Sequence, residues 1–221
     1  MFEFFIAALV VAIAPGPDNL FVLAQSATHG TRAGICVICG LCTGIAVQTT
    51  LLIVGVSALI AASPVAFFVL QCCGAAYLLY LAYKSFQVRA GVVKLDERRE
   101  TRDEREVGLD ERREGGESSG LSFRKLYLRG IIMNLTNPKA VLFALSFIPP
   151  AVRMDSALSP SLQMAILGVE FVVATFIVFG SIALLAGTVK NFLLNSPKAN
   201  RNLNWFSGCV FVLLAIALFV M

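Results

Sequence analysis

The sequence predicts an all-α integral membrane protein whose six transmembrane helices form two inverted three-helix repeats, with broken first and fourth helices. Three observations lead to this prediction. The 221 residues are 57% hydrophobic and have a mean hydropathy of +0.80, whereas soluble domains contain roughly 45–50% apolar residues. The charges gather in one segment of the chain. The apolar remainder divides into pieces near the length of about 20 residues that a bilayer-spanning helix needs.

The charge distribution separates the apolar spans from one connector. Of the 18 Lys and Arg residues, 12 lie between Lys84 and Arg129, and 10 of the 14 Asp and Glu residues lie between Asp96 and Glu117. The connector is nearly balanced and no basic face remains elsewhere, so we expect no nucleic-acid partner. The six cysteines all lie in apolar runs, which is typical of buried thiols rather than of a disulfide framework.

Six apolar segments are predicted to span the lipid bilayer. They cover roughly residues 3–24, 35–61, 64–86, 129–150, 161–187 and 203–221. The first lacks the basic residues that begin a secretory signal peptide, so it is expected to be a retained helix. The last ends with the chain, so no C-terminal domain is expected. Three domains follow: a first repeat at 1–87, a charged connector at 88–122 and a second repeat at 123–221.

The loops between the spans differ strongly in positive charge. The first, third and fifth loops together carry 16 Lys and Arg residues, whereas the second and fourth carry Arg153 alone. Lys and Arg accumulate in cytoplasmic loops. The connector is therefore predicted to be cytoplasmic and both termini to lie outside. The expected location is the plasma (inner) membrane, which the chain crosses several times.

The connector repeats a charged sequence. LDERRE occurs at 95–100 and again at 109–114. Its opposite charges interleave at three- and four-residue spacing, which favours a solvated helix, and GGESSG at 115–120 then ends that helix. A plain polar loop and a regulatory or partner-binding segment are both compatible with this pattern.

Two of the predicted spans are broken at corresponding positions. The first contains PGPDNLF at 15–21 and the fourth contains NLTNPKAVLF at 134–143, so an ionisable residue, Asp18 or Lys139, follows each break. Proline removes an amide donor and frees a carbonyl one turn earlier, and matched breaks in two halves point to the binding site of inverted-repeat transporters. The breaking residues are Pro15, Gly16, Pro17 and Pro138.

Three ionisable residues lie well inside predicted spans, namely Asp18, Lys139 and Glu170. Each costs about 2.5–3.5 kcal/mol at the middle of a membrane helix, so each should face the protein interior. A static Asp18–Lys139 ion pair would hold the two halves together. In a working site, Asp18 would bind a substrate ammonium or carry a proton, and Lys139 would bind a carboxylate. Glu170 is a second proton-coupling candidate, or a carboxyl group kept protonated against a neighbouring helix.

Amide side chains accompany both breaks. Asn19, Asn134 and Asn137 can donate and accept hydrogen bonds near the freed backbone, and they complete the predicted substrate-binding set with the two ionisable residues of the breaks. Asn134 could equally be a packing residue, and Gln48 is expected to bridge helices. Because a carboxylate and a cation that face each other suit a zwitterion, the predicted ligand is an α-amino acid.

The residues at these breaks resemble the LysE/RhtB family of small amino-acid exporters. The matching stretches are APGPDNLFVLAQSATHGTRAGI at 14–35, CGAAYLLYLAYKSF at 73–86 and FRKLYLRGIIMNLTNPKAVLFALSFIPP at 123–150. Members carry a Pro-Gly-Pro-Asn/Asp block in the first helix, a Gly-x-x-Tyr-Leu stretch in the third and an Asn-Pro-Lys block in the fourth. Order and spacing agree over nearly the whole chain, although the charged connector looks longer than is usual.

The resemblance implies a function and partners. Family members, such as lysine, homoserine-threonine and leucine exporters, are thought to use the proton gradient, often as dimers. The chain is therefore expected to be a proton antiporter and a homodimer, with no enzyme activity and no cofactor. The resemblance also divides the site into two half-sites, Pro15, Gly16, Pro17 and Asp18 in one and Asn137, Pro138 and Lys139 in the other.

A cysteine-rich stretch in the second span leaves an alternative open. CVICGLC places Cys36, Cys39 and Cys42 on one broad helix face. Thiolates bind soft metals, and some relatives handle cadmium, so the alternative function is export of a metal cation such as cadmium or of another small solute. No His or carboxylate lies nearby, which favours close packing instead, as does the Gly-x-x-x-Gly contact GLCTG at 40–44. No metal site is predicted. A thiol–disulfide enzyme is not expected, because the breaks hold no cysteine.

Overall fold

The fold consists of helices whose starts often coincide with proline. The computed structural model describes residues 2–62, 64–87, 122–153, 155–186, 188 and 197–220. The helices are α1 (Phe2–Ile13), α2 (Pro17–His29), α3 (Thr31–Ala62), α4 (Pro64–Gln87), α6 (Phe123–Thr136), α7 (Pro138–Phe147), α8 (Pro160–Leu184) and α10 (Pro197–Val220). The described part of the chain is all-helical, as predicted. The connector with its predicted LDERRE helix lies outside the described residues.

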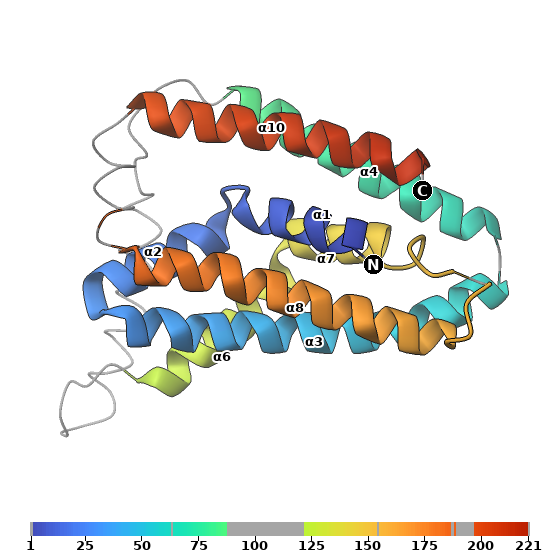
Figure 1. Cartoon of the computed structure of the whole chain (residues 1–221), viewed down its shortest axis with the longest axis horizontal. Coiled ribbons are helices and arrows are strands. Elements are labelled where there is room, and N and C mark those ends of the chain that lie inside the picture. Colours follow the sequence, from blue (N-terminus) through green and yellow to red (C-terminus); the bar gives the residue numbers. More distant parts are fainter. Residues whose placement is uncertain are drawn as a thin grey trace.

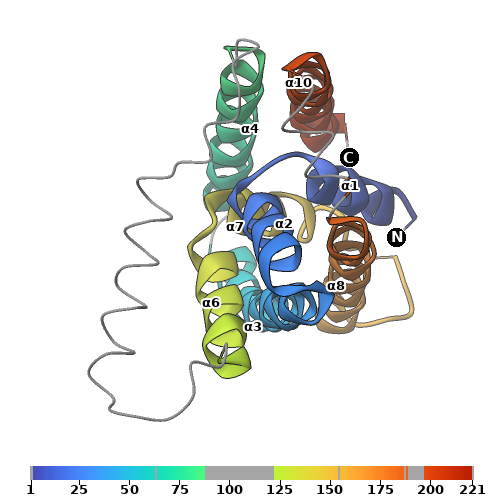
Figure 2. The same cartoon turned by 90° about the vertical axis from the view of Figure 1, so that its left-hand side faces the viewer.

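The helices stack in three layers, which Figure 1 and Figure 2 show from two sides. α4 and α10 lie side by side in one outer layer, and α3, α6 and α8 form the opposite one. The short helices α1, α2 and α7 lie between them. There α1 packs on α8 and α10, α2 on α3 and α8, and α7 on α4 and α3. The first break therefore lies within the middle layer, and the second lies where the chain passes from α6 in the outer layer to α7 in the middle layer.

The first and fourth predicted spans are each divided into two helices. α1 ends at Ile13 and α2 begins at Pro17, with a bend of 62° between them. α6 ends at Thr136 and α7 begins at Pro138, after Asn137 in an extended conformation. Proline suits the first position of a helix, where its missing N–H costs nothing, but it clashes with a preceding turn. The chain consequently starts a new helix at each of these prolines.

Several described helices could cross a bilayer. Thr31–Gly55 within α3 and the whole of α8 are long and apolar enough, and α1 with α2 would provide a third span as one bent pair. Shorter apolar helical stretches lie at Pro138–Phe147 and Asn204–Ala217. These features support a multi-pass membrane protein. Helices also occupy the other predicted segments, but six crossings related as an inverted repeat stay a prediction.

Some helices begin earlier than the predicted spans. α3 begins at Thr31 because Gly30, with φ 86° and ψ 167°, makes a one-residue turn after α2. That conformation is essentially restricted to glycine. α6 begins at Phe123 and α10 at Pro197, both before the apolar residues start. Hydropathy marks the part of a helix inside the bilayer, so it does not predict polar first turns beyond it.

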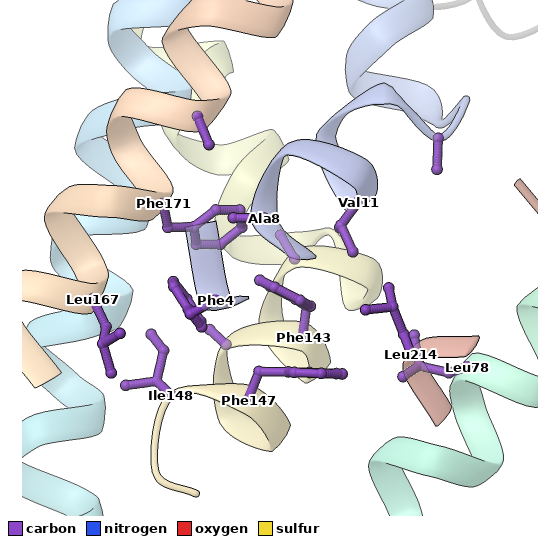
Figure 3. Close-up of a cluster of buried hydrophobic side chains, with 14 of the residues drawn as sticks. Phe4, Ala8, Val11, Leu78, Phe143, Phe147, Ile148, Leu167, Phe171 and Leu214 are labelled. Carbon is purple, nitrogen blue, oxygen red and sulfur yellow. The ribbon is translucent and has the colours of Figure 1, made fainter. Parts of the chain in front are cut away.

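An aromatic cluster holds the middle layer against α8. Phe143 of α7 stacks on Phe4 of α1 and on Phe147, with ring centroids 5.6 and 4.8 Å apart. It also meets Phe171 of α8 edge-on at 5.2 Å. Figure 3 shows these rings converging from three helices. All four are almost fully buried, and each aromatic pair contributes about 0.5–1.5 kcal/mol beyond area burial. The cluster thus joins helices from both halves of the sequence.

α3 and α6 approach so closely that their backbones touch. A Cβ atom on Gly40 would lie 3.0 Å from Cα of Gly130 and would collide with the carbonyl oxygen of Tyr127. A Cβ atom on Gly44 would lie 2.7 Å from Cβ of Asn134. The Gly-x-x-x-Gly face predicted at 40–44 therefore packs against the other half of the same chain.

The close approach predicts a stability effect. Replacing Gly40 with Ala should lower the free energy of unfolding by about 1–3 kcal/mol, the usual cost of overpacking, because backbone atoms of α6 cannot move aside as a side chain can. Thermal unfolding of the purified protein in detergent would measure this. Gly180→Ala in α8 is the matched control, since its Cβ would meet no described atom within 4 Å. Equal melting temperatures for the two variants would contradict the close contact.

Candidate functional site

The C-terminal end of α1 obtains its hydrogen-bond donors from side chains. Nζ of Lys139, in α7, donates to the carbonyl oxygens of Val11 at 3.2 Å and of Ala14 at 2.9 Å. Nδ2 of Asn19 donates to the carbonyl oxygen of Ala12 at 2.9 Å. The break has removed the amides that would serve these carbonyls in a continuous helix, and lipid offers none. A cation at a helix C-terminus is also favoured by the helix dipole.

Asn137 connects the two breaks. Its Oδ1 accepts a hydrogen bond from the backbone N–H of Lys139 at 3.0 Å and thereby caps α7. Its Nδ2 donates to Oδ2 of Asp18. Asp18 lies in the first turn of α2, where the positive end of the helix dipole favours a carboxylate. One amide side chain therefore caps one broken helix and holds the charged group of the other.

The two charged residues are buried without contacting each other directly. Asp18 is 4% exposed and Lys139 is 8% exposed. Both are described, yet no carboxylate–ammonium contact within 4 Å joins them, in contrast to Arg153 and Asp155 at the surface. Oδ1 of Asp18 has no hydrogen-bond partner among the described residues. Two carbonyls take two of the three N–H bonds that an ammonium group can donate. Both groups therefore keep some capacity for a ligand.

Gly16 leaves space between these polar groups. A Cβ atom on it would lie 3.1 Å from Nζ of Lys139 and 3.8 Å from Oδ1 of Asn19. Its backbone is extended, with φ −155°, a conformation open to any residue. The glycine is needed here for room and not for backbone freedom. Oδ1 of Asn19 is itself buried with no partner among the described residues.

Three other polar residues singled out from the sequence lie apart from this cluster. The side chain of Asn134 packs against Gly44 of α3. Gln48 is buried, but within the described residues its amide makes none of the helix-bridging hydrogen bonds expected of it. Glu170, in α8, is half-buried, and its Oε2 has no partner in the described part of the chain. The structure thus brings together Asp18 and Lys139 through their neighbouring amides, and not these three.

The cysteines of α3 face different neighbours. Sγ of Cys36 lies 3.4 Å from the carbonyl oxygen of Phe123 in α6, and Sγ of Cys42 lies 3.9 Å from that of Val172 in α8. Cys39 is exposed. Within the described residues, no group of three or more His, Cys, Asp or Glu side chains is arranged to hold a metal ion.

An apolar cavity adjoins the first break. It has a volume of about 470 Å³ and lies between α1, α2 and α8. Its lining consists of leucine, isoleucine and valine side chains together with Pro15, Asn19 and Ser181. No signal in the sequence predicts this cavity, because it depends on how the bent pair α1 and α2 packs against α8, which begins more than a hundred residues after α2 ends. The sequence did predict freed carbonyls before the prolines and an amide donor such as Asn19 beside them, but it did not predict Lys139 as their second donor.

Comparison with known proteins shows which family this chain resembles. The model of the family described as LysE type translocator matches residues 9–221. Similar proteins include the homoserine/homoserine lactone efflux protein of Salmonella typhimurium (strain LT2), which is 29% identical over 218 residues, or 98% of this chain and 94% of that protein. The leucine efflux protein of Salmonella choleraesuis is 27% identical over 209 residues, or 95% and 89%. No solved structure matches.

The family match extends over both breaks and all helices after the start of α1. It confirms the family expected from the Pro-Gly-Pro and Asn-Pro-Lys blocks, and with it a transporter rather than an enzyme. The chain belongs to the family of LysE type translocators.

Proposed function

We propose that this protein exports α-amino acids from the cytoplasm across the plasma (inner) membrane, in exchange for protons. The observation that carries the proposal is the pair of buried, opposite charges at the two breaks, each with bonding capacity left over. A zwitterion presents a carboxylate and an ammonium group to such a pair. The similar proteins named for efflux of homoserine, homoserine lactone and leucine support a substrate of this class.

The proposed roles follow from the contacts of each residue. Lys139 binds the substrate carboxylate with its remaining N–H, and Oδ1 of Asp18 accepts from the substrate ammonium. Asn137 keeps the two at a fixed separation, and Asn19 adds a second acceptor beside Gly16. Asn134 contributes through its backbone, since its carbonyl oxygen accepts from the N–H of Asn137 at 3.1 Å. A proton that enters from outside and binds Asp18 would remove the charge that holds the ammonium group, so release is coupled to proton entry. Glu170 is the second candidate for proton coupling.

The proposed architecture places this exchange at the interface of two inverted three-helix repeats, 1–87 and 123–221. The connector 88–122 is proposed to be cytoplasmic and both termini to lie outside. Each half has three helices, so the second half enters the membrane from the side opposite to the first. Rocking of one half against the other would therefore expose the breaks alternately to the two sides of the membrane. The proposal includes a homodimer, because the family that this chain resembles is thought to act often as dimers.

Removing the charge of Asp18 should reduce transport while leaving the fold intact. Asp18→Asn keeps the size of the side chain and an oxygen that can accept from Asn137, but it removes the charge. We expect efflux of the preferred amino acid to fall at least tenfold, on the order of the loss of one charge-assisted hydrogen bond. Cells loaded with a panel of dipeptides would report which amino acids the protein releases. Asp155→Asn, at an exposed loop, is the control. Unchanged proton-coupled efflux in Asp18→Asn would remove Asp18 from the mechanism.

Lys139→Met should reduce transport more than it reduces folding. Methionine keeps much of the apolar stem, while the carbonyls of Val11 and Ala14 lose their donor at a cost of about 1–3 kcal/mol each. The measurement compares efflux with the yield of monodisperse protein after detergent extraction. Lys84→Met, at an exposed position near the end of α4, is the control. An aggregated variant that cannot be extracted would instead assign Lys139 a purely structural role.

The alternative of metal-cation export has its own test. Replacing Cys36, Cys39 and Cys42 together with alanine should leave amino-acid efflux within about twofold of the parent, because Cys36 and Cys42 contact different helices and Cys39 is exposed, and helix contacts in membranes favour small side chains such as alanine. Efflux of labelled cadmium and of amino acids would be followed side by side. Loss of cadmium efflux in the triple variant would support the alternative.

A further inference from the structure

The apolar cavity beside the first break has a polar end. Asn19 lines it and is 8% exposed, and Oδ1 of this amide has no partner in the part of the chain that the structure describes. A buried acceptor without a donor costs about 1–3 kcal/mol, and the apolar walls offer no donor. Nδ2 of the same amide is held by the carbonyl of Ala12, which fixes the side chain. The lining residue Asn19 therefore carries a fixed, buried acceptor that has no partner among the described residues.

The same end of the cavity lies close to the charged group of the other break. Oδ1 of Asn19 and Nζ of Lys139 both lie within 4 Å of the point where a Cβ atom of Gly16 would stand. Pro15 and Asn19, on either side of Gly16 in the sequence, both line the cavity. The break at Gly16 is thus adjacent both to the cavity lining and to Nζ of Lys139.

The walls determine what fits behind the polar end. Leu9 and Ile13 of α1, Leu20 and Leu23 of α2 and Val178 of α8 contribute aliphatic carbon. The volume of about 470 Å³ falls in the range of about 300–1,000 Å³ that is typical of small-molecule sites. A charged or strongly polar side chain would lose its hydration there without a partner, whereas an aliphatic one gains about 0.8 kcal/mol for each buried CH₂.

We propose that this cavity is the side-chain subsite of the transporter and that it selects α-amino acids with aliphatic side chains of four or more atoms, such as leucine. This inference rests on the proposed function of amino-acid export. The substrate carboxylate lies toward Lys139, the ammonium group toward Asp18 and Oδ1 of Asn19, and the side chain between α1, α2 and α8. Ile13 and Ile177, which are 42% and 50% exposed, border the open side of the cavity.

The test reduces the volume of the cavity by a substitution in α8 and leaves the residues at the breaks unchanged. Ser181 lines the cavity, and its hydroxyl donates to the carbonyl of Ile177 in its own helix, so phenylalanine at this position adds volume without removing a tertiary hydrogen bond. Ser181→Phe should lower leucine efflux at least tenfold, which is the size of effect that one or two methylene groups have in a hydrophobic pocket. Alanine efflux should stay within about twofold, because its methyl side chain needs little of the cavity. Leu184→Phe, on an exposed part of the same helix outside the cavity, should change neither rate.

A second variant works in the opposite direction. Ile182→Ala enlarges the cavity, so efflux of phenylalanine should rise several-fold relative to that of leucine. The full-length protein reconstituted in liposomes, loaded separately with labelled leucine, alanine, phenylalanine, homoserine and lysine, provides all these rates. The measurement does not depend on Ser181→Phe alone, because the two variants shift selectivity in different directions.

The outcomes separate this inference from the proposed function. If the parent protein exports none of the amino acids, both fail. If it exports amino acids but favours lysine or homoserine over leucine, the subsite assignment fails and amino-acid export stands. The same holds if both cavity variants leave the ratios between substrates unchanged, as they would if a lipid acyl chain occupied the cavity. Opposite shifts of selectivity in the two variants support the assignment.

Discussion

The hydrogen bonds from Lys139 to the end of α1 are the contacts on which the middle layer depends. A helix that stops inside the apolar interior leaves carbonyls with no water to bind. Here a side chain from the fourth predicted span serves two of them, and Asn19 serves a third. The negative end of the α1 dipole also stabilises the ammonium group of Lys139. The two broken helices thereby stabilise each other.

Tight and loose packing are divided between different parts of the fold. Where α3 meets α6, glycines bring two backbones together and leave no room for a single added carbon. Where α1 and α2 diverge from α8, a cavity remains. The aromatic cluster around Phe143 ties α1 and α7 to α8. The cavity is thus lined by α1, α2 and α8 and not by the closely packed pair α3 and α6.

Local signals predicted more of this structure than non-local ones. Proline at the start of α2 and α7 predicted both breaks, because a proline ends the helix before it whatever surrounds it. The charged residues at the breaks were found because any ionised group in an apolar span is conspicuous. The partners of Lys139 could not be predicted, since they are backbone carbonyls 125 and 128 residues away. Gln48 was expected to bridge helices by its residue type alone, and its buried amide lacks such partners within the described residues.

The order in which the chain is made gives the Lys139 contacts a further consequence. A ribosome completes α1 and α2 more than a hundred residues before it reaches Pro138. Until then, the carbonyls of Val11 and Ala14 and the carboxylate of Asp18 lack the partners they have in the finished fold. Water or the insertion machinery must serve them meanwhile. The first span is therefore the first to be synthesised and among the last to reach its final hydrogen bonding, and a chain that stops in the connector lacks the residues that complete it.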